Sequence, residues 1–130
     1  MRNITYIFIS AALIVFASCG NKTAEGLAER VVPAYAHNIK FKTMPSADGK
    51  DYFELFMRGN RLIIKGNNAG SMAVGLNYSL KNYCNTTVSW YDFNPVTVPQ
   101  SMPAVEKRER HSALCPDRFF LNYCTFGYTF

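Results

Sequence analysis

The sequence predicts an α+β fold, in which a small antiparallel or mixed sheet carries its helices on one face. Two observations lead to this prediction. The stretch DYFELFMRGNRLIIKG, residues 51–66, indicates a β-hairpin, because glycine and asparagine in Arg58-Gly59-Asn60 accept the backbone conformations of tight turns. The next stretch, residues 67–85, carries apolar side chains at helical spacing. A hairpin followed by an amphipathic helix is typical of a sheet covered on one face.

Residues 1–18 are predicted to be a signal peptide. Arg2 supplies the positive charge, Tyr6 to Ala17 form an apolar run, and small residues precede Cys19. This pattern is typical of a bacterial lipoprotein, so we expect export, lipidation at Cys19 and anchoring to a membrane. The anchored protein would sit at the outer membrane, on its periplasmic face or at the cell surface. The alternatives are an ordinary cleaved signal with an incidental cysteine and an uncleaved anchor.

Residues 19–25 are expected to form a tether, and residues 26–95 an α+β domain. The domain begins with apolar side chains at helical spacing, which predict a short helix that Pro33 disturbs. The stretch NIKFKTM, residues 38–44, then alternates apolar and charged side chains and predicts a half-buried strand. Both strands of the hairpin carry apolar residues on both faces, so both faces of the sheet are expected to be partly covered.

The helix after the hairpin is the most strongly predicted element. Asn67 or Asn68 is expected to be its N-cap. Gly70 and Gly75 each cost up to about 1 kcal/mol relative to alanine, which is tolerated where a helix approaches a sheet closely. The apolar stripe consists of Ala69, Met72, Ala73, Leu76, Leu80 and Tyr83.

Three segments follow this helix. Residues 86–93 are rich in β-branched and aromatic side chains and predict a strand. Residues 96–117 contain Pro99 and Pro103 and are expected to be a connector, in which EKRER is interpreted as a solvated linker. Residues 118–130 return to a strand pattern.

The composition excludes several kinds of function. Lys and Arg number 14 against 9 Asp and Glu, and without a dense basic stripe no nucleic-acid partner is expected. No cofactor or metal motif is present, and His37 and His111 are expected to be surface residues. With Cys19 lipidated, Cys84, Cys115 and Cys124 remain as an odd number of thiols. The sequence leaves open whether Cys84 and Cys115 form a disulfide or stay as buried thiols.

A family resemblance adds what spacing alone does not provide. The chain resembles the N-terminal region of the α-N-acetylglucosaminidases, glycoside hydrolase family 89, in two motifs. The first is "I-X-G" leading into "A-X-G-L-X-X-Y-L-K-X-X-C", followed by Trp90. The second is "R-(Y/F)-(Y/F)-X-N-X-C-T-X-X-Y-(S/T)-F" at residues 118–130. The matching residues are Ile64, Gly66, Ala73, Gly75, Leu76, Leu80, Lys81 and Cys84, then Arg118, Phe119, Phe120, Asn122, Cys124, Thr125, Tyr128, Thr129 and Phe130.

The resemblance implies a fold, an activity and a site. Residues 26–95 would be the non-catalytic domain of a glycosidase, and residues 118–130 the truncated start of a (β/α)8-type barrel. The family implies a retaining glycosidase acting on terminal α-linked N-acetylglucosamine of glycans, with two catalytic glutamates that this fragment lacks. Asn122, Cys124 and Tyr128 would help to form the sugar pocket; the alternative is that Asn122 and Cys124 only pack the barrel.

The expected function is therefore that of an N-terminal fragment of an exported α-N-acetylglucosaminidase-like enzyme, inactive by itself. Its partners would be a glycan ending in N-acetylglucosamine, through the full-length enzyme, and the membrane. The alternative is a standalone lipoprotein module that binds glycan or protein through Trp90, Tyr91 and Phe93. The apolar residues at 119–130 favour the fragment, because a standalone domain would leave them uncovered.

Overall fold

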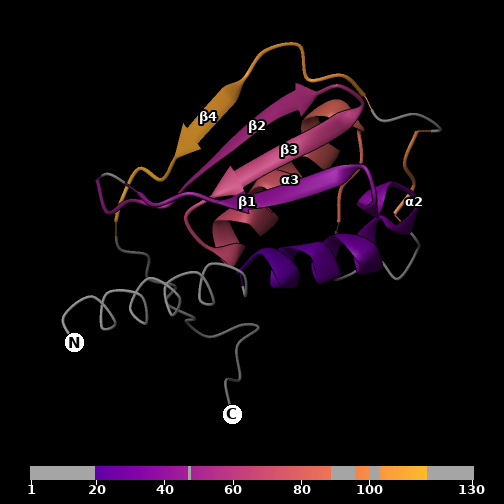
Figure 1. Cartoon of the computed structure of the whole chain (residues 1–130). Helices are drawn as coiled ribbons and strands as arrows, with labels where there is room; N and C mark the ends of the chain where they lie inside the picture. The colour runs from indigo at the N-terminus through magenta and orange to yellow at the C-terminus, as the bar shows by residue number, and fades with distance from the viewer. Residues whose placement is uncertain (1–19, 47, 89–95, 100–102, 117–130) are drawn as a thin grey trace, which may run out of the picture.

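The computed structural model describes residues 20–46, 48–88, 96–99 and 103–116 of the 130-residue chain. These residues form two layers, a sheet and a layer of helices packed against one of its faces (Figure 1). The predicted α+β class is confirmed. In the part of the chain described, no helix is both long and apolar enough to cross a membrane.

The sheet is four-stranded and mixed, with the strand order β1-β3-β2-β4. β1 is parallel to β3, while β2 runs antiparallel to both β3 and β4. The loop after β1 crosses the end of β3 to reach β2, and Met44 N donates a 2.9 Å hydrogen bond to Gly66 O there. In chain order, the elements are a helix at residues 20–31, α2 Pro33–Ala36, β1 Ile39–Thr43, β2 Tyr52–Arg58, β3 Arg61–Gly66, α3 Ala69–Tyr83 and β4 Glu109–Ser112.

The first helix is longer than the sequence predicts. The residues from 20 onward are helical in place of the expected tether at 19–25, because Ala24, Ala28 and Val32 recur every four residues and are each 1% exposed. Pro33 interrupts this helix as expected, but it also occupies the first turn of the short helix α2. Proline is favoured there because its missing N–H would have no partner within the helix.

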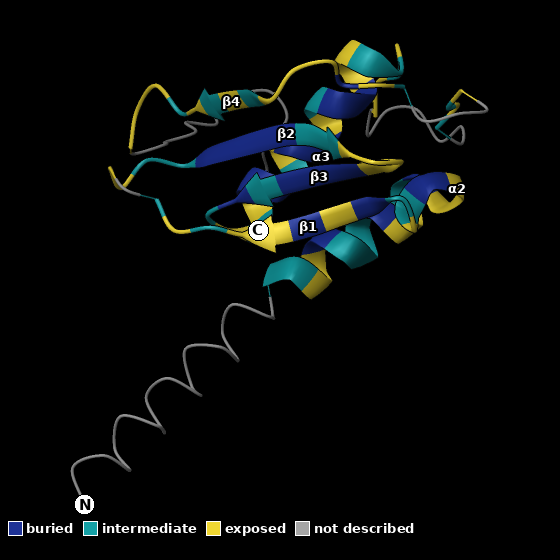
Figure 2. Ribbon diagram, turned by 45° about the horizontal axis from the view of Figure 1, so that its top comes forward, coloured by how far each residue is buried: buried dark blue, intermediate teal, exposed yellow. Residues whose placement is uncertain are grey.

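The hairpin agrees with the sequence prediction. Gly59, with φ of +59°, lies in the turn between β2 and β3, where positive φ suits glycine. Leu55 and Ile64 are opposite each other in register, face the helices and are fully buried. On the outward face Tyr52 and Ile63 are also buried, whereas Lys40 and Lys42 are exposed, so this face is partly covered, as the sequence predicts. Figure 2 shows buried and exposed residues alternating along β1, the half-buried strand that the sequence predicts.

α3 lies directly against the hairpin because one of its glycines permits close contact. A Cβ atom added to Gly75 would come within 2.8 Å of Ile64 Cγ2 and 3.2 Å of Phe53 Cδ2. This confirms the close approach predicted at that position, whereas Gly70 is exposed. Asn68 is the N-cap, and its side chain accepts a 2.8 Å hydrogen bond from Ser71 N.

The residues after α3 differ from the sequence prediction. Residues 86–88, the described start of the predicted strand at 86–93, have no strand structure, and residues 89–93 lie outside the described residues. The expected connector at 96–117 contains β4, whose four residues pair with β2. EKRER is therefore not simply a solvated linker. The last two residues of this charged segment begin β4, in which Glu109 and His111 point to one face of the sheet and Arg110 and Ser112 to the other.

Candidate functional site

The residues that the family resemblance assigns to a sugar pocket, and the cysteine predicted to carry lipid, lie outside the described residues. They are Asn122, Cys124, Tyr128 and Cys19, and the same holds for the aromatic residues Trp90, Tyr91 and Phe93. His37, exposed, lies just after α2, as expected of a surface histidine. His111 does not lie in an irregular connector. It belongs to β4 and faces the helix layer, where its ring contacts Tyr78 of α3.

The carboxylate of Glu109 accepts hydrogen bonds from several side chains of the site. Its Oε2 accepts a 2.9 Å hydrogen bond from the phenol of Tyr78, and its Oε1 accepts one from the phenol of Tyr83. Nε2 of His111 lies 3.0 Å from Oε2 of the same carboxylate. Since an ionised carboxylate can only accept, this ring nitrogen must carry a proton. Both carboxylate oxygens are thus occupied by donors from α3 and β4.

The electrostatics of the cluster follow from these hydrogen bonds. The bond from Tyr83, followed by that from His111, holds the pKa of Glu109 below its ordinary value. The same bond to Glu109, with burial, raises the pKa of Tyr83 to about 12. The pKa of Tyr78 is also raised, mainly by its bond to Glu109. At neutral pH the cluster therefore holds one carboxylate and two protonated phenols.

Aromatic rings surround the same carboxylate. The imidazole of His111 stacks on Phe53 with 5.0 Å between ring centroids, and it lies 4.4 Å from the ring of Tyr78. Phe53 and Tyr78 are themselves 5.5 Å apart. These rings come from β2, β4 and α3, so the cluster joins three elements through apolar contact as well as through hydrogen bonds.

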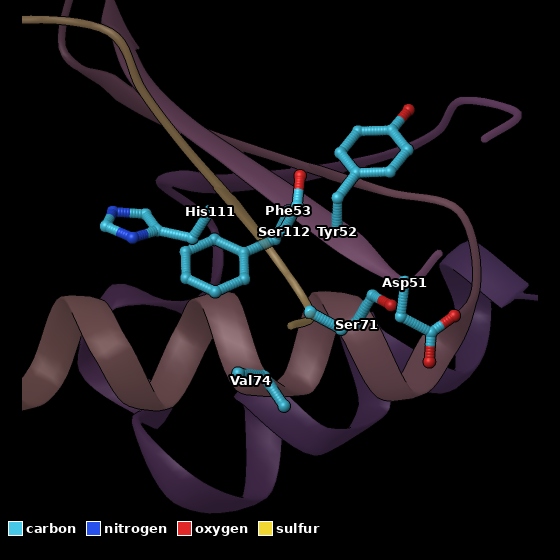
Figure 3. A pocket seen from close by; sticks show the side chains of 8 residues that line it. Asp51, Tyr52, Phe53, Ser71, Val74, His111 and Ser112 are labelled. Atoms are coloured by element: carbon cyan, nitrogen blue, oxygen red, sulfur yellow. The ribbon is translucent and has the colours of Figure 1, made fainter. Parts of the chain in front are cut away.

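A hollow of ≈ 190 Å³ adjoins this cluster (Figure 3). The rings of His111 and Phe53 lie at one end and Asp51 at the other, with Val74 of α3 below, while the ring of Tyr52 points away. This volume is smaller than the roughly 300–1,000 Å³ of typical ligand clefts. The residues that line it are Asp51, Tyr52, Phe53, Ser71, Val74, His111, Ser112 and Ala113.

Asp51, at the rim of the hollow, fastens the start of α3. Its Oδ1 accepts 2.7 Å hydrogen bonds from the side-chain amides of Asn67 and Asn68. The side-chain oxygen Oδ1 of Asn67 in turn accepts bonds from Tyr52 N, at 3.2 Å, and from Ser71 Oγ, at 2.8 Å. This network connects the beginning of β2 with the first turn of α3, and the Asp51 carboxylate is engaged by it.

The hydrogen bonds of Glu109 and Asp51 position backbone elements and do not form a catalytic pair for glycoside hydrolysis. Glycoside hydrolysis needs two carboxyl groups at about 5–10 Å with access to the sugar, but Glu109 and Asp51 are each engaged by donors from their own domain. Among the described residues, no three His, Cys, Asp or Glu side chains come together in a group that could hold a metal ion. The Glu109 cluster therefore holds β4 against α3 and β2.

The two described cysteines are free thiols. Cys84 is half-buried at the end of α3, where burial raises the pKa of its thiol, and Cys115 is exposed after β4. In the structure they form no disulfide, which leaves the buried-thiol alternative for Cys84 alone. The raised pKa of Cys84 disfavours the thiolate that a nucleophilic cysteine needs.

Comparison with known proteins identifies the domain. Residues 22–104 match the family model described as the alpha-N-acetylglucosaminidase (NAGLU) N-terminal domain. The chain belongs to this family. The match covers the helix at residues 20–31 almost completely, the first three strands of the sheet, and α3.

Solved structures of this family's glycosidases have the same fold. A double Glu-to-Gln variant of the Clostridium perfringens family 89 enzyme, in complex with its substrate GlcNAc-alpha-1,4-galactose, matches with a TM-score of 0.77 and 32% identity. The match spans 88% of this chain and 13% of that one. The complex of the C. perfringens enzyme with PUGNAc matches with a TM-score of 0.72, and that with 2-acetamido-1,2-dideoxynojirmycin with 0.69, both at 32% identity and 13% of the enzyme.

The chain thus spans a small part of the C. perfringens enzyme that it matches. The matches cover 88% and 86% of this chain in the PUGNAc and nojirimycin-type complexes. No match was found among curated proteins. The predicted membership of the α-N-acetylglucosaminidase family is confirmed for the N-terminal domain.

Sequence reasoning missed the Glu109 cluster. The useful signal was the alternation in ERHS, residues 109–112, which places Glu109 and His111 on one face of a strand. Tyr78 and Tyr83 were visible as helix residues, but nothing in the sequence connects them with a carboxylate 31 or 26 positions later.

Proposed function

We propose that this chain is the N-terminal, non-catalytic part of an exported α-N-acetylglucosaminidase-like glycoside hydrolase that acts on terminal α-linked N-acetylglucosamine of glycans. The observation that carries the proposal is the likeness to the C. perfringens family 89 enzyme, at 32% identity over 88% of the chain. That enzyme is described in complex with a substrate whose first sugar is N-acetylglucosamine.

The chain by itself is proposed to be inactive. Four described acids are engaged within the domain: Asp48, Asp51, Glu54 and Glu109 take part in hydrogen bonds or ion pairs. Glu25, Glu29 and Glu106 are the other described acids, and they lie on helical or irregular segments away from the hollow of Figure 3. None of these arrangements resembles a nucleophile and an acid/base facing one sugar.

The role of the domain would be to position the chain that leads toward the sugar pocket. β4 ends at Ser112, and the resemblance assigns the pocket residues Asn122, Cys124 and Tyr128 to the segment that follows. The Glu109 cluster fixes β4 on α3 and β2, so it would also fix the point from which that segment departs. A displacement of about 1 Å in such a support can reduce turnover roughly 100-fold.

A domain replacement tests this role. The corresponding 13% of the C. perfringens enzyme would be exchanged for this chain, and hydrolysis of GlcNAc-alpha-1,4-galactose would be measured. Retained activity supports the proposal. In such a replacement, the further variant Glu109→Ala should lower kcat and change KM little. A correctly folded replacement without activity, judged by its circular dichroism and unfolding midpoint, would contradict it.

The inactivity of the isolated chain is tested directly. The purified 130-residue chain is expected to release no 4-nitrophenol from 4-nitrophenyl α-N-acetylglucosaminide above the buffer rate. The C. perfringens enzyme serves as the positive control. Clear turnover that persists through repeated purification would contradict this part of the proposal.

The chain is further proposed to be a lipoprotein anchored through Cys19. Asn21 already belongs to the folded domain, since its Oδ1 accepts a 3.0 Å hydrogen bond from Thr43 Oγ1. A lipid on Cys19 would therefore hold the domain at the membrane surface with almost no spacer. Mass spectrometry of the mature N-terminal peptide would detect the acyl chains, and Cys19→Ser should release the protein from the membrane fraction. An unmodified mature peptide would favour the ordinary signal.

A further inference from the structure

The outward face of the sheet is strongly basic. Residues that are opposite each other in register point to the same face of the sheet. The register therefore identifies the side chains that share the outward face. Lys40 and Lys42 of β1 lie beside Ile63 and Lys65 of β3. Beyond β3 the basic residues continue along β2 and β4 on the same outward face. The cations of this basic face are Lys40, Lys42, Arg58, Arg61, Lys65, Arg108 and Arg110.

Glu54 is the acid that the described structure shows among these cations. Its carboxylate is 3.6 Å from Arg110 Nη1 and 4.0 Å from Lys65 Nζ, and the residue is only 7% exposed. Its Oε2 makes no hydrogen bond within the described part of the chain. Glu54 therefore compensates one end of the basic face, and one of its oxygens retains the capacity to accept a further donor.

The other end of the face is not compensated. Lys40, Lys42, Arg58 and Arg61 are exposed and surround a shallow hollow of ≈ 590 Å³ together with Asn38, Asn60 and Ile63. Within the residues that the structure describes, none of these four cations takes part in an ion pair. A hollow bounded by unpaired cations and by amides concentrates anions through both charge and hydrogen bonding.

The placement of these charges lowers the stability of the sheet. Arg58 is directly opposite Arg61, and Lys42 is directly opposite Lys65. Like charges in directly opposite positions are destabilising. A fold that only needed solubility could mix the two signs on this face. An anionic ligand would offset the repulsion, which is the arrangement expected of a binding surface.

The shape of the face favours an extended ligand with repeated charges. Neighbouring strands lie about 4.8 Å apart and same-face residues along a strand about 7 Å apart, so the cations form a regular grid. Arg108 and Arg110 lie over the rings of Phe56 and Tyr52, at 4.1 Å and 4.2 Å, which presents their N–H edges along the same surface. A single small anion would contact only one or two of these cations.

The position of the face also distinguishes it from the anchored end of the domain. Asn21 contacts Thr43, at the end of β1 that is aligned with Gly66 of β3. Arg61 lies at the opposite end of β3, with Arg58 of β2 opposite it, a distance of about 17 Å for a strand of this length. A lipid on Cys19 would thus lie near the Lys42 end of the hollow and remote from Arg58 and Arg61, so these two arginines are not favoured as a contact with the same membrane.

We propose that this basic face binds an acidic polysaccharide, a glycan chain bearing repeated carboxylate or sulfate groups. The choice of a glycan over another polyanion rests on the proposed function, because a domain of a glycan-degrading enzyme meets such chains beside its catalytic site. The face would hold the polymer away from the reacting end, through salt-sensitive contacts to the four uncompensated cations.

Equilibrium binding of the full purified chain tests this proposal. Dextran sulfate and polygalacturonate serve as acidic probes, and neutral dextran as the uncharged control. We expect binding of both acidic polymers that weakens steadily as salt is added, and no binding of dextran. Absence of binding to both acidic polymers at low salt overturns the proposal.

Charge-matched variants separate the face from net charge. The variant Lys40→Gln/Arg58→Gln/Arg61→Gln removes three cations of the hollow, whereas Lys22→Gln/Arg30→Gln/Lys81→Gln removes three exposed cations elsewhere. The first should bind about tenfold more weakly, because it removes three of the exposed ion pairs on which binding depends. The second should remain within about twofold of the parent. Equal losses in both variants overturn the proposal.

Two further measurements complete the test. The unfolding midpoint of the first variant should be unchanged or higher, since repulsion is relieved; if it does not fold, Lys40→Gln/Lys42→Gln replaces it in the binding assay. Tighter binding to phosphatidylglycerol vesicles or to duplex DNA than to the acidic polymers assigns the face to another ligand. These assays need no catalysis, so their outcome is independent of the domain replacement that tests the proposed function.

Discussion

Tyr78 of α3 donates a 2.9 Å hydrogen bond to the carboxylate of Glu109 in β4, a residue 31 positions later in the chain. β4 has four residues and is bonded to the sheet through β2. Backbone pairing alone gives so short an edge strand little stability. The contacts of Glu109 with α3 therefore add to the pairing with β2 in holding β4 in the sheet.

Replacing this carboxylate should destabilise the domain measurably. Glu109→Gln keeps the size of the side chain but removes the charge that the three donors share, so we expect the free energy of unfolding to fall by about 1–2 kcal/mol. Urea denaturation followed by circular dichroism measures it. Glu29→Gln, at an exposed helix position, should stay within about 0.5 kcal/mol of the parent. Similar losses in both variants would contradict the assigned role.

The same carboxylate predicts a dependence of stability on acid. The pKa of Glu109 is lowered in the folded state, below the ordinary 4.5, by its hydrogen bonds from Tyr83, His111 and Tyr78. Its contribution to stability is therefore complete above pH 4.5 and is lost as the pH falls through the lower, folded value. Unfolding measured across this range should show a shallower pH dependence for Glu109→Gln. Parallel curves for parent and variant would argue against the contribution.

The stability of the domain at alkaline pH should depend on the ionisation of Tyr83. Its pKa is raised from 10.0 to about 12, so its contribution to stability is complete below pH 10 and is lost as the pH rises through about 12. Titration of tyrosinate absorbance should show a late-ionising phenol that is missing from Tyr83→Phe. The parent chain, titrated under the same conditions, is the comparison. Identical late transitions in the parent and Tyr83→Phe would be the contrary result.

Gly75 should be intolerant of any side chain. Gly75→Ala places a methyl group 2.8 Å from Ile64 Cγ2, and we expect a loss of about 1–3 kcal/mol from overpacking. The control is Gly26→Ala in the first helix, where the new Cβ lies 3.6 Å from Arg30 Nη1, an ordinary contact. That change should stabilise by up to about 1 kcal/mol through helix propensity. The sign difference between the two variants, measured by thermal unfolding, is the decisive readout.

The N-cap of α3 provides a further prediction. Asn68 accepts from Ser71 N at 2.8 Å and donates to Asp51 at 2.7 Å, so Asn68→Ala should cost about 1–2 kcal/mol. Asn68→Ser keeps an acceptor for the helix but loses the donor to Asp51, and it should cost less. If serine destabilises as much as alanine in urea denaturation, the bond to Asp51 rather than the cap carries the effect.

Much of the fold was predictable because local patterns determined it. The alternation at β1, the Arg58-Gly59-Asn60 turn, and the stripe and N-cap of α3 each depend on neighbours within a few residues. The start of the first helix is not predicted, because Asn21 and Thr23 are polar and Ala24 is buried only through its place in the hydrophobic core of the folded domain. Tertiary packing, rather than helix propensity, set that boundary.

The site was less predictable than the fold. The charge run that contains Glu109 predicts a solvated linker, and only the pairing of β4 with β2 brings this residue to Tyr78 and Tyr83. The basic face was concealed for the same reason. Its lysines and arginines are dispersed along the sequence as a mild excess, and the sheet register gathers them on one surface. Long-range pairing of this kind leaves no local signal.

The parallel pairing of β1 with β3 sets an order of events during folding. β2 and β3 are joined by the tight turn at Gly59 and can zip together within microseconds, whereas β1 must close a loop that contains the whole of β2. The strand made first at the ribosome is thus expected to dock last among these three. Slower, late closure of this kind is what limits the folding rate of domains with distant strand partners.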